Sequence, residues 1–164
     1  MRCLTVAFAF LVLTLQASAE VGGQESDAPP PEMKVQKKLV GTWTGDQKTS
    51  VPKDTASNTH VVKRELVLGG RFLQEMGNFD DKGKPTFTGM YTYDSNRKAY
   101  RYWFFMSSVF CWEPTGTWDE SSQTFTFKGR LGAGDTGTMT ATLRFSDEAT
   151  FVYSLVATDP GGKV

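Results

Sequence analysis

An alternation of apolar and polar residues with a period of two runs through the second half of the chain. Phe125 and Phe127 alternate with threonines and Lys128, and residues 137–145 alternate between apolar residues and Thr or Arg. Successive side chains of a β-strand point to opposite faces, so this pattern is typical of antiparallel strands with one face buried and the other in water. The chain is therefore predicted to be an all-β protein.

Short segments rich in Asp, Ser, Asn and Gly separate the predicted strands. Residues 32–39, which follow three consecutive prolines, are expected to form one or two helical turns. The short, sequential connections favour an antiparallel up-and-down β-barrel over a sandwich, because a Greek-key sandwich needs longer crossovers. We expect the strands near residues 40–47, 59–68, 71–79, 86–93, 98–106, 109–118, 123–130, 136–145 and 148–157.

The first 19 residues have the three-part layout of a secretory signal peptide: Arg2, an apolar run over residues 4–15, and Ala17-Ser18-Ala19 as a cleavage site. A membrane anchor is the alternative, but this run is shorter than the roughly 20 residues that a spanning helix needs. We therefore expect a secreted or periplasmic protein with no transmembrane segment after cleavage. Its parts would be a signal peptide (1–19), a flexible Pro-rich linker (20–31) and a single β-barrel domain (32–164). A further strand would only begin at Lys163, so either the chain ends raggedly or it is a fragment.

The composition argues against several kinds of partner. Lys and Arg number 18, as do Asp and Glu, so a basic surface for nucleic acid or anionic membranes is not expected. With one His and two Cys, a zinc site is not expected either, and neither is another metal or cofactor. Signal cleavage would leave Cys111 without an intrachain partner. We expect it to be a buried small apolar residue, with a reactive thiol or an intermolecular disulfide as alternatives.

A candidate binding site follows from residues that we interpret as facing the barrel interior. Arg64 shares a face with apolar residues of its strand, and Gln74 and Asn78 on the next strand are expected beside it. Buried polar groups need partners, such as water, one another or a ligand; a bulge in the hairpin would instead leave Arg64 solvated. In a ligand site the aromatic rings and a methionine would supply apolar area, and the guanidinium would hold an acidic headgroup. The predicted ligand-binding residues are Arg64, Met76, Tyr91, Tyr102 and Phe125.

No catalytic constellation is predicted. His60 would have to act as the base of a hydrolase, and no Gly-x-Ser-x-Gly elbow is present. Glu65 and Glu75, on the two arms of a hairpin, form a conceivable acid–base pair, although exposed strand carboxylates are far commoner. We therefore interpret the protein as a non-enzyme.

Several motifs together resemble a known but uncharacterised bacterial family, the domain of unknown function 1579. The Gly41-x-Trp43 motif, after a short helix and at the start of a strand, also resembles the lipocalin and calycin signature. That resemblance implies a lipocalin-like barrel with Trp43 packed across its closed end. The family implies no reaction and no catalytic residue. The motifs that carry the family resemblance are Lys38–Trp43, Leu68–Leu73, Gly89–Asp94, Lys98–Tyr100 with Trp103, and Gly116–Asp119 with Thr124–Gly129.

Two functions fit these observations. The first is an exported, non-enzymatic β-barrel that binds a small apolar or amphipathic ligand. The second is a structural or protein-interaction module with a filled barrel and no ligand. The interior distinguishes them, because inward-facing small residues would leave a cavity and a wall of Phe and Trp would close it. The sequence does not indicate the oligomeric state.

Overall fold

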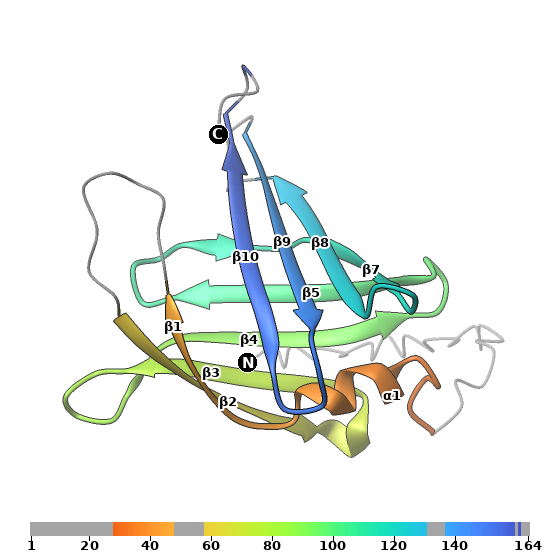
Figure 1. Ribbon diagram of the computed structural model, residues 1–164, viewed down its shortest axis with the longest axis horizontal. Coiled ribbons are helices and arrows are strands. Elements are labelled where there is room, and N and C mark those ends of the chain that lie inside the picture. The colour runs from red at the N-terminus through yellow and green to blue at the C-terminus, as the bar shows by residue number, and fades with distance from the viewer. Residues whose placement is uncertain (1–27, 48–57, 131–136, 160, 162–164) are drawn as a thin grey trace, which may run out of the picture.

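Figure 1 shows the computed structural model of the protein, which describes residues 28–47, 58–130, 137–159 and 161. The predicted signal peptide and residues 20–27 of the predicted linker lie outside the described residues. Within the described ranges, no helix has the length and apolar character needed to cross a membrane.

The short N-terminal helix and the antiparallel strands are confirmed. Helix α1 (Met33–Gln36) continues as the 3-10 turn η1 (Lys37–Leu39) and leads into the sheet, which has ten strands in the described part of the chain. A second 3-10 turn, η2 (Leu68–Gly70), joins β2 to β3. The strands are β1 (Gly41–Gln47), β2 (Asn58–Val67), β3 (Phe72–Phe79), β4 (Pro85–Asp94), β5 (Ala99–Met106), β6 (Cys111–Trp112), β7 (Thr115–Asp119), β8 (Thr124–Arg130), β9 (Thr138–Phe145) and β10 (Phe151–Thr158).

The strands follow one another along the sheet in chain order, apart from short β6, which pairs with β5. This meander confirms the up-and-down prediction. The described strands β1 and β10 do not pair with each other, so the sheet is a curled half-barrel with two free edges (Figure 1). The predicted strand over residues 109–118 is two strands, β6 and β7. Buried Pro114 separates them, because proline has no N–H to contribute to a strand ladder.

The concave face of the sheet carries the hydrophobic core. Leu73 lies opposite Tyr91, which in turn lies opposite Tyr102, and all three are buried. Directly opposite residues of an antiparallel pair share a face, so the remaining core residues extend the same surface. They are Tyr100, Trp112, Phe125, Phe127, Met139, Ala141, Leu143 and Phe145, with Leu39 joining them from η1.

The helix and Trp43 cover one end of the half-barrel. The Trp43 indole N–H donates to the Leu39 carbonyl oxygen at 2.8 Å, and its ring centroid lies 4.6 Å from that of Phe151. Because Phe151 opens β10, this contact joins the two free edges of the sheet at the helix end. The Trp43 ring is only partly buried, so it covers this end without being enclosed.

Inward-facing glycines let aromatic rings lie against the backbone of neighbouring strands. A Cβ at Gly116 would lie 2.5 Å from the Phe127 ring, and one at Gly89 would lie 2.7 Å from the Tyr102 ring. Real side chains do not approach so closely, so these positions need glycine. The concave face is therefore filled by rings over strands β4 to β8.

Cys111 is exposed, which corrects the expectation that it is buried. It pairs with Phe105 of β5, whose side chain is also exposed on the convex face. Strand β5 carries apolar side chains on both faces, so the sequence pattern does not indicate which side of the β5–β6 hairpin is buried.

Candidate functional site

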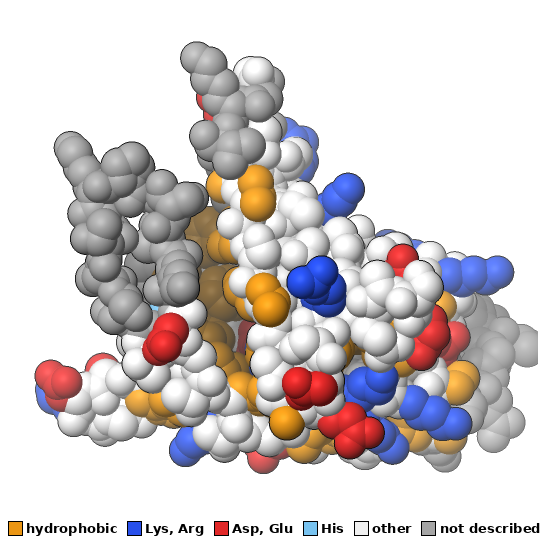
Figure 2. Space-filling view, viewed as in Figure 1, with side chains coloured by type: hydrophobic (Ala, Val, Ile, Leu, Met, Phe, Trp, Pro, Cys, Tyr) orange, Lys and Arg blue, Asp and Glu red, His pale blue; other side chains and the backbone are white. Residues whose placement is uncertain are grey.

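Part of the concave face beside β10 is open to solvent. Tyr153 and Leu155 lie opposite Leu143 and Ala141 and so belong to the inner face. They are nevertheless 52% and 49% exposed, whereas Leu143 and Ala141 are buried. Figure 2 shows a recess with apolar side chains in its depth on one side of β10. This recess is the candidate site.

A buried ion pair lies on the same concave face. The register of the β2–β3 hairpin places Arg64 opposite Glu75. The Arg64 Nε–H donates to Glu75 Oε2 at 2.9 Å, and the two residues are only 7% and 3% exposed. The guanidinium Cζ lies 5.3 Å from the ring centroid of Phe151, so the pair adjoins the free edge strand β10.

Two stacked tyrosines complete the surroundings of Glu75. The Tyr102 hydroxyl donates to Glu75 Oε1, so both carboxylate oxygens of Glu75 have partners. The Tyr91 and Tyr102 rings stack with centroids 3.9 Å apart and 5° between their planes. Burial, and then the negative charge of Glu75, raise the pKa of both tyrosines well above the ordinary value of 10.0. Both hydroxyls are therefore neutral donors at physiological pH.

The guanidinium of Arg64 keeps one hydrogen-bond donor without a partner. Arg64 Nη1 is buried and has no hydrogen-bond partner. Burial by itself lowers the pKa of Arg64, but the charge and hydrogen bond of Glu75, together with Tyr91 and Tyr102, raise it by more, so the guanidinium stays charged. Burial of part of the side chain and the charge of Glu75 raise the pKa of Tyr153 to about 12. Arg64, Glu75, Tyr91 and Tyr102 thus form a buried polar cluster on the same concave face as the open recess.

Three of the five predicted ligand-binding residues lie in this polar cluster: Arg64, Tyr91 and Tyr102. The alternative of a solvated Arg64 is wrong, because its side chain is buried against Glu75. Phe125 is on the same face but only 1% exposed, and it packs with Tyr100 deep in the core.

Met76 lies on the opposite face of the sheet from Arg64. It pairs with Lys63, which is exposed on the convex side, and Gln74 pairs with exposed Glu65. The physical reason is the parity of the hairpin. Four residues separate the paired Val67 and Phe72, so even-numbered residues of β2 share a face with odd-numbered residues of β3.

Sequence reasoning missed Glu75 as a member of the polar cluster and Tyr153 as a residue of the open inner face. The hairpin parity was the signal that could have placed Glu75 opposite Arg64. The conceivable acid–base pair of Glu65 and Glu75 does not form, because the two carboxylates lie on opposite faces. Among the described residues, no three His, Cys, Asp or Glu side chains converge in a way that could hold a metal ion.

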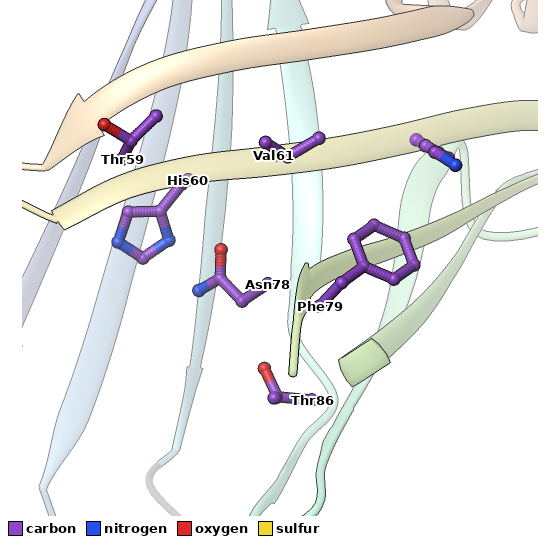
Figure 3. A pocket seen from close by; sticks show the side chains of 7 residues that line it. Thr59, His60, Val61, Asn78, Phe79 and Thr86 are labelled. Carbon is purple, nitrogen blue, oxygen red and sulfur yellow. The ribbon is translucent and has the colours of Figure 1, made fainter. Parts of the chain in front are cut away.

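A second hollow, with a volume of about 570 Å³, lies where β2 and β3 separate (Figure 3). Asn78 adopts a left-handed conformation with φ 50°, and the β2–β3 ladder ends just before it, at Val62 and Gly77. The His60 and Asn78 side chains lie beside each other, and His60 Nε2 and Asn78 Oδ1 have no hydrogen-bond partners. The lining residues are Thr59, His60, Val61, Lys63, Asn78, Phe79 and Thr86.

Comparison with known proteins gives one family. A search of curated proteins found no match. A family model described as protein of unknown function (DUF1579) matches residues 28–164, which include the helix and every strand of the sheet. The resemblance found in the sequence motifs is thereby confirmed, and a lipocalin-like barrel fits the observed fold. The chain therefore belongs to the DUF1579 family of proteins of unknown function.

Proposed function

We propose that the protein is an exported, non-enzymatic module that binds a small apolar or amphipathic molecule in the recess beside β10. The observation that carries the proposal is the half-exposed, inward-facing pair Tyr153 and Leu155 next to a buried polar cluster. An apolar inner surface open to water gains free energy when another apolar group covers it. The unpartnered Arg64 Nη1 gains in the same way from a hydrogen-bond acceptor.

Export is part of this proposal and is supported by the signal-peptide layout of residues 1–19. A binding role, in preference to catalysis, is supported by the state of the polar cluster. Its carboxylate already has a partner on each oxygen, through Arg64 and Tyr102, so it is poorly suited to act as a general base.

The free strand β10 offers a matched pair of variants for testing the site. Tyr153 and Val152 are 52% and 53% exposed but lie on opposite faces of the strand. We expect Tyr153→Ser to weaken binding of the neutral dye Nile red about tenfold, the effect of losing roughly 60 Å² of apolar contact. Val152→Ser should leave the affinity unchanged.

Fluorescence titration of the folded variants measures both affinities. Equal losses for the two variants would mean that the dye does not enter the concave face. No binding to the unmodified protein would contradict the proposal itself. Native mass spectrometry of protein isolated from its own host then shows whether a small molecule is retained.

A specific feature of β10 also favours the second candidate function, a protein-interaction module. The eight residues from Phe151 to Thr158 contain no charge, no proline and no glycine, although they form a free edge of the described sheet. Free edges usually carry such protective residues, because an unpaired strand adds to other strands. The opposite edge, β1, contains Asp46 and two glycines.

The proposed partner in this second function is another copy of the chain, through antiparallel pairing of the two β10 strands. An uncharged strand meets no like-charge repulsion when it pairs with itself about a twofold axis. Sedimentation equilibrium should show a dimer that Val152→Lys with Val156→Lys converts to monomer, while Thr42→Lys with Thr44→Lys on the β1 edge does not. A monomer at all concentrations would rule this function out.

A further inference from the structure

The donors and charges around Arg64 indicate which polar group the recess accepts. Resting on the binding function proposed above, we infer that the preferred molecule carries an uncharged hydrogen-bond acceptor, such as an amide or ester carbonyl, on an apolar body. A carboxylate is disfavoured. This differs from the acidic headgroup that the sequence alone predicts for Arg64.

The hydrogen-bonding capacity of the polar cluster is the first step. Both oxygens of Glu75 are occupied, one by Arg64 Nε and the other by the Tyr102 hydroxyl. The group left over is Arg64 Nη1, which can only donate. The molecule that completes this cluster must therefore present an acceptor.

The charge of the cluster is the second step. Arg64 and Glu75 neutralise each other at 2.9 Å, and each is more than nine-tenths buried. A carboxylate bound at Nη1 would lose its hydration beside an ion pair with no net positive charge and would be repelled by Glu75. An uncharged carbonyl makes the same hydrogen bond with a much smaller desolvation cost.

The position of the guanidinium is the third step. Cζ lies 5.3 Å from the ring centroid of Phe151, the first residue of β10. Arg64 therefore adjoins the first residue of the free edge strand, along which Tyr153 and Leu155 follow with inward-facing, half-exposed side chains. A molecule whose apolar body covers these two side chains can place its polar end toward Nη1.

A headgroup series on one alkyl chain tests this inference. The probes are dodecanamide, dodecanoate and dodecylammonium, each competing with Nile red at neutral pH. We expect dodecanamide to bind about tenfold or more tightly than dodecanoate. Dodecylammonium, which has donors only, should bind more weakly than the amide.

Glu75→Gln keeps the shape of the side chain and an acceptor for Tyr102 but leaves the guanidinium uncompensated. The ratio of dodecanoate to dodecanamide affinity should then rise about tenfold or more in favour of the acid. Glu65→Gln is the matched control, because it makes the same charge change on the convex face and should leave the ratio unchanged.

The outcomes separate this inference from the function on which it rests. If the unmodified protein binds Nile red and prefers dodecanoate, the binding function stands and the neutral-headgroup inference is overturned. An unchanged ratio in folded Glu75→Gln overturns it as well. If neither the dye nor any probe binds, the proposed function fails, and the inference fails with it. Should Glu75→Gln not fold, the preference of the unmodified protein decides.

Discussion

The buried pair of Arg64 and Glu75 allows the interior of the sheet to be tested by a double-mutant cycle. Glu75→Leu leaves a buried guanidinium without its carboxylate and removes the acceptor of the Tyr102 hydroxyl. Arg64→Met leaves a buried carboxylate that keeps only Tyr102. Breaking one side of a buried pair typically costs about 3–5 kcal/mol of unfolding free energy. We expect Glu75→Leu near the upper end of that range and Arg64→Met near the lower end.

The double variant, Arg64→Met with Glu75→Leu, should be much closer to the unmodified protein. It replaces both charges with apolar side chains of similar size, so no uncompensated charge is buried. The remaining cost is the Tyr102 hydroxyl without an acceptor, about 1–3 kcal/mol, offset in part by new apolar packing. The two single costs should therefore exceed the cost of the double variant by at least about 3 kcal/mol.

Urea unfolding followed by tryptophan fluorescence measures each corner of the cycle. Trp112 is a suitable reporter, because its ring centroid lies 6.1 Å from that of Tyr102. Equal m-values across the four proteins are required for the comparison. The pair of Arg101 and Glu113 is the control, since the Glu113 carboxylate is exposed and pairs open to solvent couple by less than about 1 kcal/mol. Additive costs for Arg64 and Glu75 would refute the buried pair.

Four further predictions concern stability, ionisation and processing. Gly116→Ala should lower the free energy of unfolding in urea by about 1–3 kcal/mol, because its Cβ would lie 2.5 Å from the Phe127 ring. Gly45→Ala, where a Cβ has nothing within 4 Å, should be nearly neutral, and equal losses for the two variants would contradict the ring packing. Trp43→Ala should cost about 2–3 kcal/mol in the same assay, below the value for a fully buried Trp because the ring is partly exposed; a cost near zero would remove its role at the helix end. The pKa values of Tyr100 and Tyr153 are raised to about 12, so the stability from their neutral hydroxyls is complete below pH 10 and is lost as pH rises from about 10 to 12. The tyrosinate absorption of the folded protein should therefore rise at higher pH than that of the protein unfolded in urea. Coincident titration curves would contradict this. N-terminal sequencing of protein recovered outside the cytoplasm should begin at or near Glu20, and an intact Met1 there would show that the signal is not cleaved.

The strands could be predicted closely from the sequence, since their side-chain pattern reflects a local backbone property. The expected strand over residues 98–106 is β5, Ala99–Met106, and the one over 123–130 is β8, Thr124–Arg130. Closure of the barrel could not be predicted in the same way. Whether β1 meets β10 depends on strand tilt and stagger summed across the whole sheet, which no short pattern encodes.

The faces of the strands were predictable only where one face is clearly polar. On β2, Lys63 and Glu65 identify the solvent side, so Arg64 could be placed inward. On β3, the apolar residues Leu73 and Met76 point to opposite faces of the strand, so the sequence pattern does not indicate which face is buried. Met76 was therefore placed on the wrong face, although the hairpin connection contained the information needed to place it.

The buried ion pair connects stability to function. Two charges inside an apolar core rarely contribute net stability over apolar side chains of the same size, so stability by itself does not account for Arg64 and Glu75. If the double variant folds with little loss, the contribution of the pair must lie elsewhere, and the unpartnered Nη1 beside an open apolar recess is where a ligand would use it. That same variant should then bind dodecanamide at least about tenfold more weakly while remaining folded, because it lacks the donor. A stable double variant with unchanged affinity would separate the pair from binding altogether.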